Sequence, residues 1–172
     1  MAPEPTEKQE TVKLVSAQIL IKRGKAIHDL IARRAYAIFE RCGRVHGSDV
    51  SDWVSAESEV LFPCRHTLKD TPDRLVLVAE MPGSFTANEL ELSVEPHRLM
   101  VSAEKKIEAI YADERGGHFQ IMPERIFRVH QLSAEVDPSR TTAALRGNIL
   151  EVVMPKAAPN RVSARHATQS GR

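Results

Sequence analysis

The sequence predicts an antiparallel β-sandwich preceded by a small helical hairpin domain. Apolar and polar residues alternate along several short runs between residues 75 and 156, which is the pattern of strands with one buried face. No long helical pattern separates these runs, so antiparallel pairing of the strands fits best. Before residue 62, apolar residues recur at spacings of three and four, as they do along one face of a helix.

Turn residues divide the predicted sandwich into strands. Pro82 and Gly83 close the first strand, because proline cannot donate to a ladder and glycine accepts turn dihedrals. Gly147 and Asn148 both tolerate positive φ, which predicts a tight turn before the last strand. The expected strands are residues 75–81, 90–94, 99–103, 126–132, 141–145 and 149–154.

Two amphipathic helices are expected before the sandwich. Gly43 is a plausible C-terminal cap of the first helix, and the second helix should begin at Ser51 or Asp52. The predicted inward stripes are Ile27, Leu30, Ile31, Ala35, Ile38, Phe39 and Cys42 on the first helix, and Trp53, Ala56, Val60 and Leu61 on the second. We interpret Trp53 as an anchor of this core in preference to a platform for a ligand.

Between residues 75 and 156 a set of short motifs follows a fixed order. It comprises Ala79-Glu80-Met81-Pro82-Gly83, Leu90-Glu91-Leu92-Ser93-Val94, Leu99-Met100-Val101-Ser102-Ala103, Phe127-Arg128, Val136-Asp137-Pro138, Asn148-Ile149-Leu150 and Pro155-Lys156. The ordered set resembles the α-crystallin domain of small heat-shock proteins over residues 63–156. This resemblance implies an immunoglobulin-like β-sandwich of the α-crystallin type.

The resemblance also implies a dimer interface. Arg128 matches an arginine that helps to hold the dimer in this family, and the alternative is a surface strand arginine. The segment 107–123, with Tyr111 and Phe119, has the length at which bacterial members extend a strand to a neighbouring subunit. The alternative for this segment is a flexible charged loop. The expected interface residues are Arg128, Tyr111 and Phe119.

A groove between two edge strands receives an Ile-x-Ile or Ile-x-Val tail motif in the family. By position, the groove and client-binding residues here are Leu90, Leu92, Val94, Thr141, Ala143 and Leu145. The sequence departs from the family at a polar Thr141, at His130 in place of an aromatic residue, and at Ser133 in place of proline. The tail offers only Val162-Ser163-Ala164 as a degenerate motif, so we expect a dimer or small homo-oligomer in place of a large cage.

The helical piece has a resemblance of its own. Arg34-Ala35-Tyr36, Phe39-Glu40, Gly43-Arg44 and Asp52-Trp53 with Ala56-Glu57 are similar to a small bacterial domain family of unknown function. We divide the chain into a flexible or partly helical segment (1–25), a helical hairpin domain (26–62), the α-crystallin-like sandwich (63–157) and a flexible tail (158–172). In the first segment, Val12, Val15 and Ile19 permit an amphipathic helix, whereas Pro3 and Pro5 favour disorder.

Composition and motifs exclude several classes of function. With 24 basic and 23 acidic residues, the chain lacks the electrostatic footprint of a nucleic-acid or membrane-surface protein. No signal peptide and no membrane span is recognisable, so we expect a cytoplasmic protein. Two separate cysteines and seven dispersed histidines suggest neither a disulfide nor a metal site, and no catalytic or cofactor-binding motif is present.

The function that follows from the resemblance is an ATP-independent chaperone, or holdase, that binds partly unfolded client proteins and prevents their aggregation under stress. The alternative is an interaction adaptor or co-chaperone module that docks one folded partner. An enzyme is the least expected function, because neither resemblance brings catalytic residues.

Overall fold

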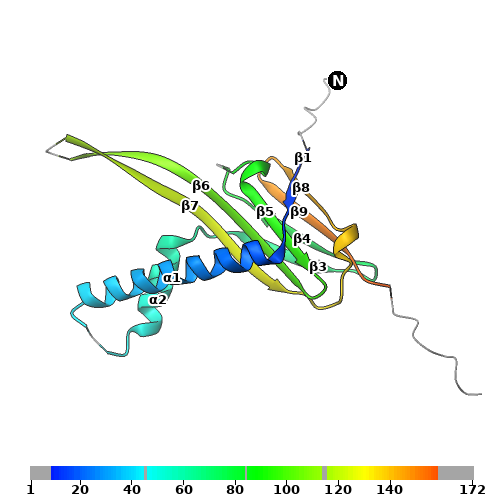
Figure 1. Ribbon diagram of the computed structural model, residues 1–172, viewed down its shortest axis with the longest axis horizontal. Helices are drawn as coiled ribbons and strands as arrows, with labels where there is room; N and C mark the ends of the chain where they lie inside the picture. The colour runs from blue at the N-terminus through cyan, green and yellow to red at the C-terminus, as the bar shows by residue number, and fades with distance from the viewer. Residues whose placement is uncertain (1–8, 45, 84, 114–115, 159–172) are drawn as a thin grey trace, which may run out of the picture.

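Two β-sheets packed face to face form the body of the molecule, and two helices lie against one of them (Figure 1). The computed structural model describes the backbone of residues 9–44, 46–83, 85–113 and 116–158, and their side chains except those of residues 106–123. The first sheet has the order β1-β8-β9-β4-β3 and the second the order β2-β5-β6-β7. The predicted sandwich with a preceding pair of helices is confirmed.

The strands occur in the sequence as follows. They are β1 (Gln9–Thr11), β2 (Lys13–Leu14), β3 (Arg65–Asp70), β4 (Arg74–Glu80), β5 (Leu90–Glu95), β6 (Arg98–Asp113), β7 (Gly116–Gln131), β8 (Thr142–Arg146) and β9 (Ile149–Pro155). Short 3-10 turns precede β5 and β8, at Ala87–Glu89 and Pro138–Arg140. Neighbouring strands pair antiparallel except β2 and β5, which are parallel.

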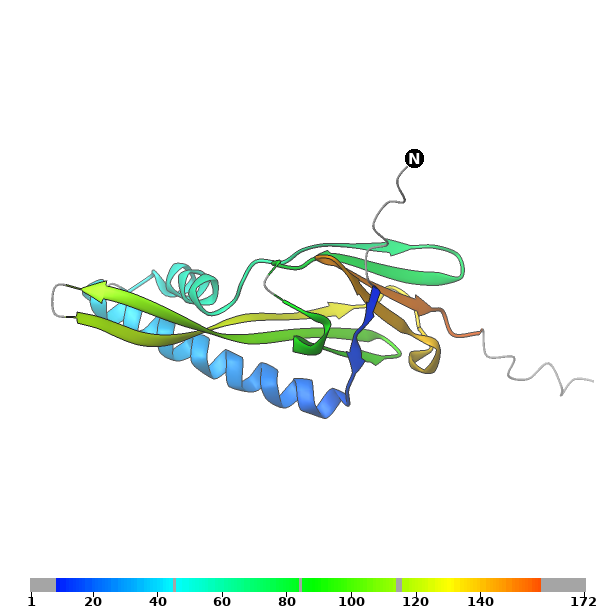
Figure 2. The same cartoon turned by 90° about the horizontal axis from the view of Figure 1, so that it is seen from above.

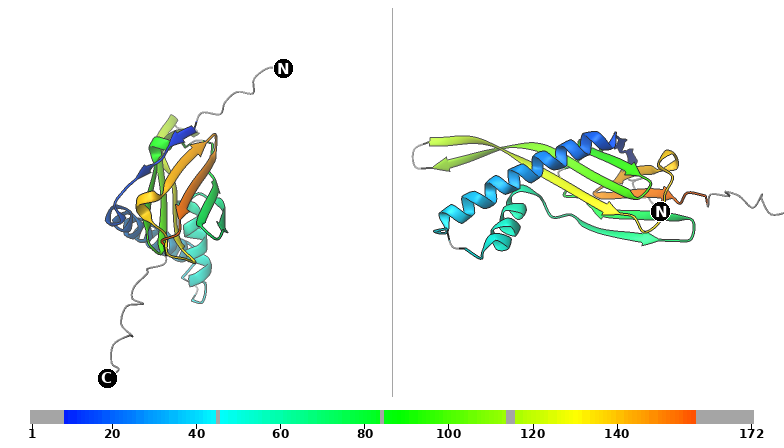
Figure 3. Two further views of the ribbon diagram at one scale, coloured as in Figure 1. Left: turned by 90° about the vertical axis from the view of Figure 1, so that its right-hand side faces the viewer. Right: turned by 60° about the horizontal axis from the view of Figure 1, so that its bottom comes forward.

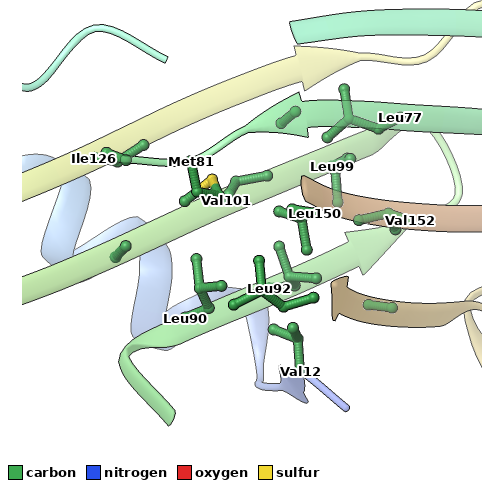
Figure 4. Close-up of a cluster of buried hydrophobic side chains, with 14 of the residues drawn as sticks. Val12, Leu77, Met81, Leu90, Leu92, Leu99, Val101, Ile126, Leu150 and Val152 are labelled. Carbon is green, nitrogen blue, oxygen red and sulfur yellow. The ribbon is translucent and has the colours of Figure 1, made fainter. Parts of the chain in front are cut away.

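The sandwich core consists of the inward residues of both sheets (Figure 4). Along β4 and β9, buried residues alternate with half-buried ones as the period of two requires. Leu92, Leu99, Leu150 and Val152 are all fully buried. The turn between β8 and β9 places Gly147 at φ 56°, which confirms the turn predicted from glycine and asparagine.

The helices are α1 (Ala17–Arg41) and α2 (Asp49–Val60). Ile27, Ile31 and Ile38 of α1 pack with Ala56 and Leu61 in a second core cluster. Gly43 follows α1 at φ 83°, as expected of a residue that ends a helix.

Two details of the predicted helices are wrong. Helix α1 begins at Ala17, inside the segment 1–25 for which a partly helical structure was one alternative, but α2 begins at Asp49 instead of Ser51 or Asp52. Cys42 is exposed and does not belong to the buried stripe, because it lies one residue beyond the end of α1, where the helical periodicity no longer applies.

Helix α1 packs on the outer face of the second sheet, against β5 and β6 (Figure 2). Phe127 of β7 contacts the core of the helical hairpin. A methyl group on Gly24 would lie 2.8 Å from Cζ and 2.9 Å from Cε1 of Phe127. Gly24 therefore permits the close approach of helix and sheet, although glycine disfavours a helix interior.

We expect Gly24→Ala to destabilise the protein by about 1 kcal/mol or more, because the new methyl group overlaps the Phe127 ring. Helix propensity alone predicts the opposite sign, a gain of about 1 kcal/mol. The measurement is urea unfolding of Gly24→Ala in the wild-type and Phe127→Leu backgrounds. The smaller leucine side chain in the Phe127→Leu background should relieve the overlap, and a stabilising Gly24→Ala in the wild-type background contradicts the prediction.

The β6–β7 pair continues past the other strands toward the end of the molecule that holds the helical hairpin (Figures 1 and 2). Backbone pairing runs without interruption from Arg98 opposite Gln131 to Asp113 opposite Gly116. Residues 107–113 and 116–122 are therefore strand residues that pair with each other, and not a loop. The side chains of Tyr111 and Phe119 lie outside the described residues.

Candidate functional site

The edges of β5 and β8 meet at one side of the sandwich, where the sequence placed a binding groove. Leu90, Leu92, Ala143 and Leu145 are buried in the sandwich core, and Val94 packs against them half-buried. Thr141 is also buried, just before β8, and its hydroxyl donates a hydrogen bond to the carbonyl oxygen of Asp137 at 3.2 Å. The structure thus brings the apolar groove residues together, whereas Thr141 is bonded to the turn before β8.

Residues 9–15, which we call the strap, run along both of these strand edges. The strap pairs with β8 through β1 and then with β5 through β2, so it crosses from one sheet to the other (Figure 3). At the crossing, the amide of Val12 donates to the carbonyl oxygen of Ala143 at 3.1 Å. The amide of Val15 donates to the carbonyl oxygen of Leu92 at 2.7 Å. The strap therefore gives both strand edges a backbone partner.

Val12 fills the space between the two strand edges. Its side chain is 3% exposed and belongs to the sandwich core, beside Leu92 (Figure 4). Val12 is the one buried residue of the strap, and Leu14 is 44% exposed. Val12 therefore fills the space beside Leu92 and Ala143, and these two predicted groove residues do not face an open groove.

The sequence prediction missed the strap. Val12, Val15 and Ile19 have a spacing that suits one face of a helix, but Ile19 is 49% exposed. Only a short pattern in the sequence indicated a strand here. Two β-branched residues, Thr11 and Val12, are followed by alternation of polar and apolar residues through Leu14.

The start of α1 is fastened to β5 and β6 independently of the strap. Arg23 forms an ion pair with Glu91 of β5, and its Nη1 donates to Ser102 Oγ of β6 at 2.9 Å. Leu20 is fully buried, and so are the outward-facing Met100 and Ser102. The first two turns of α1 therefore cover the outer face of the second sheet beside the strap.

The opposite side of the sandwich is closed by side chains of β3 and β7. The rings of His66 and His130 make an edge contact with centroids 4.5 Å apart. Arg128 lies on the same face of β7 as His130, with Nη1 4.0 Å from Glu57 Oε1 of α2. Burial raises the pKa of the nearby Cys64 thiol, and the positive charge of Arg128 partly offsets that rise. Within the described residues, Arg128 thus has a partner inside its own chain.

We expect acidification from pH 7.5 to 5.5 to lower the stability of the fold through the contact between His130 of β7 and His66 of β3. Burial, then the neighbouring His66 and Arg128, lower the pKa of His130 from its ordinary value of 6.5. The unfolded chain therefore binds a proton more readily than the folded chain, so stability is fully present above about pH 6.5 and falls as the pH drops toward the lowered pKa.

The measurement is the melting temperature across this range for the wild type and for His130→Phe, which keeps a ring and removes the titration. The wild type should lose more stability than the variant. Hydrogen bonds lower the pKa values of the carboxyl groups of Asp70, Asp73 and Asp137. Protonation of these groups therefore changes stability only in more acidic solutions. Parallel curves for the two proteins exclude His130 as the cause.

The helical hairpin has a shallow cleft between α1 and α2, of about 400 Å³ and lined by Tyr36, Phe39 and Trp53 among others. Trp53 is half-buried, packs against the hairpin core and has its ring centroid 4.9 Å from that of His28. Its contact with the core agrees with a role as an anchor, while one side of the ring borders the cleft.

The described part of the chain offers neither a metal site nor a membrane span. It contains no group of three or more His, Cys, Asp or Glu side chains placed to hold a metal ion. None of its helices has both the length and the apolar character needed to cross a bilayer.

Comparison with solved structures finds similar folds among small heat-shock proteins. A small heat-shock protein from Xylella fastidiosa is 23% identical, with a TM-score of 0.44, covering 64% of this chain and 98% of that one. Heat shock protein 16.0 from Schizosaccharomyces pombe is 16% identical, with a TM-score of 0.45 and coverage of 73% and 95%. Stress-induced protein 1 from Caenorhabditis elegans is 15% identical, with a TM-score of 0.42 and coverage of 61% and 100%. Comparison with curated proteins gives no match.

Two family models match the sequence. Residues 27–61 match a family described as a protein of unknown function (DUF2934), which agrees with the helical hairpin. Residues 67–168 match the Hsp20/alpha crystallin family. Because this second match spans more than half of the chain, the protein belongs to the Hsp20/alpha crystallin family.

Proposed function

We propose that the protein is an ATP-independent holdase that binds partly unfolded proteins and keeps them from aggregating under stress. The observation that carries the proposal is the match of residues 67–168 to the Hsp20/alpha crystallin family, a family of non-enzymatic chaperones. The same proposal places the protein in the cytoplasm, where cell fractionation should find it.

Holdase activity requires apolar surface that an unfolded chain can cover. Such binding gains about 25 cal/mol per Å² of apolar area before entropic costs, so it is weak per contact and broad in specificity. We propose the groove residues under the strap as one client surface. Further apolar side chains are already exposed on the helices and strands, namely Ile19, Ile21, Tyr36, Val50, Val54, Val129 and Ile149.

The test is suppression of heat-induced aggregation of several unrelated proteins, followed by light scattering without ATP. A holdase should suppress aggregation of all of them near stoichiometric amounts, whereas an inert protein at equal mass should not. No suppression at excess protein contradicts the holdase and favours an adaptor that docks one folded partner.

We further propose that the protein forms a dimer or a small oligomer. Two features support this: residues 157–172 offer only the degenerate motif Val162-Ser163-Ala164, and the strap pairs with both strand edges at the proposed groove. Multi-angle light scattering measures the mass directly. A stable assembly on the order of a dozen subunits or more contradicts the proposal.

Arg128, Tyr111 and Phe119 remain our proposed dimer residues. We expect Arg128→Ala to raise the dissociation constant of the dimer by about tenfold, because losing one member of a charge pair at an interface weakens association. Sedimentation at several concentrations measures this, with the exposed helix residue Arg33 as the control, changed to alanine. An unchanged dimer assigns Arg128 to its contact with Glu57 inside the chain.

A further inference from the structure

An extended segment of the same chain, the strap, already occupies the proposed groove between β5 and β8. The strap is extended, and its backbone pairs antiparallel with β8 from Gln9 opposite Arg146 to Thr11 opposite Ala144. It then runs parallel to β5, with Lys13 opposite Glu91. Only one side chain of the strap, that of Val12, is buried. Main-chain hydrogen bonds and one aliphatic side chain therefore make up most of this contact.

We propose that the strap is a displaceable occupant of the groove, and that an extended aliphatic segment of an unfolded client takes its place. This inference rests on the proposed holdase function and adds a form of regulation to it. While the strap is docked the groove is closed, and when the strap leaves, the edges of β5 and β8 become available together.

The strap can leave while the rest of the fold stays in place. Strand β5 still pairs with β6, and β8 still pairs with β9 along its whole length. Helix α1 keeps its own attachment through Leu20 and through Arg23 with Glu91. Ser16, between strap and helix, has an extended backbone with φ −61° and ψ 140°, so a change of dihedral angles there moves the strap alone. A short segment with one buried side chain belongs to the least stable part of a fold.

The contacts of the strap define the competitor. The carbonyl oxygens of Ala143 and Leu92 accept hydrogen bonds from the amides of Val12 and Val15, and any extended chain can supply such donors regardless of its sequence. The space occupied by Val12 accepts one aliphatic side chain of similar size. Strand addition to an open edge combines these two requirements, and unfolded chains meet them far more often than folded proteins do.

The first experiment locks the strap. Thr11 and Ala144 are directly opposite each other in an antiparallel pair, where Cα atoms lie about 4.5–5.5 Å apart and a disulfide fits. Thr11→Cys with Ala144→Cys is prepared after Cys42→Ser and Cys64→Ala have removed the native thiols. The control disulfide is Val78→Cys with Glu151→Cys, which joins β4 to β9 at another directly opposed pair.

The oxidised strap lock should lose at least about tenfold in suppression of client aggregation, and reduction should restore it, because apparent affinity scales with the fraction of molecules whose groove is empty. The control disulfide should change nothing. Equal suppression by the oxidised and reduced strap lock overturns the inference and leaves the holdase function intact. Disulfide-linked dimers on a non-reducing gel also overturn it, since the strap would then belong to the groove of a second copy.

The second experiment opens the groove and reads binding directly. Val12→Asp places a carboxylate in the buried position and should release the strap, whereas Leu14→Asp adds the same charge at a residue that is 44% exposed. The probe is a fluorescent peptide with the strap sequence from Gln9 to Val15, followed by anisotropy. It should bind Val12→Asp about tenfold or more tighter than the wild type or Leu14→Asp, and should not bind the oxidised lock.

This peptide measurement separates the two proposals. If no form of the protein suppresses aggregation, the holdase function fails, and the peptide still decides whether the strap is displaceable. Equal binding of the peptide to Val12→Asp, wild type and oxidised lock overturns the strap inference.

Discussion

Leu92→Asp should unfold the β-sandwich at ordinary temperature. Leu92 is fully buried between the two sheets, next to Val12 (Figure 4). Removing the leucine side chain alone costs about 2–5 kcal/mol, and a buried carboxylate without a partner adds to that cost or must take up a proton. The total is comparable to the whole stability of a typical domain, about 5–15 kcal/mol.

Far-UV circular dichroism and urea titration measure this loss. Val129→Asp is the matched control, because it introduces the same group on a strand of the same sheet at a side chain that is 47% exposed. The control should change stability by about 0.5 kcal/mol or less. A Leu92→Asp protein that unfolds at nearly the wild-type urea concentration shows that Leu92 does not lie in the core.

Ala56→Asp should open the helical hairpin and leave the sandwich folded. Ala56 is completely buried where α2 faces Ile27 and Ile31 of α1. There is no room for a larger polar group, so we expect a local loss of about 3 kcal/mol or more from overpacking and burial of the carboxyl group. The sandwich has its own core cluster, separate from that of the helices.

Trp53 reports on this change, because it is the single tryptophan of the chain and packs against the hairpin core. Its emission should shift to longer wavelength in Ala56→Asp, while amides of β4 and β9 stay protected from hydrogen exchange. Ser55→Asp, on the exposed face of α2, is the control and should keep the wild-type spectrum. Loss of protection in β4 and β9 contradicts the independence of the two cores.

The strands with strong alternation were predictable from the sequence. The first predicted strand, starting at Leu75, and the last, starting at Ile149, agree with β4 and β9 to within a residue or two, since one face of each is buried. Strand β3 was not predicted, because it is an edge strand in which only Leu68 is half-buried and the other residues are exposed. A strand held mainly by backbone pairing leaves little trace in a hydrophobic pattern.

The strands that carry the proposed site were predictable, whereas the segment that covers them was not. Leu90, Leu92, Ala143 and Leu145 lie on β5 and β8, as the alternating pattern predicted, because they are core residues of the sandwich. The cover depends on Val12, whose burial results from a contact with strands far away in the sequence. The position of Arg128 relative to Glu57 was equally inaccessible, since it depends on how α2 packs against β7.

Docking of the strap has a consequence for the order in which the contacts of the molecule form during folding. Gln9 receives a hydrogen bond from Arg146, 137 positions later in the sequence. Contacts of such separation require a long loop to close first, so they form late during folding. Docking of residues 9–15 against β8 should therefore be among the last steps of refolding, and until it occurs the outer edge of β8 has no backbone partner from the strap.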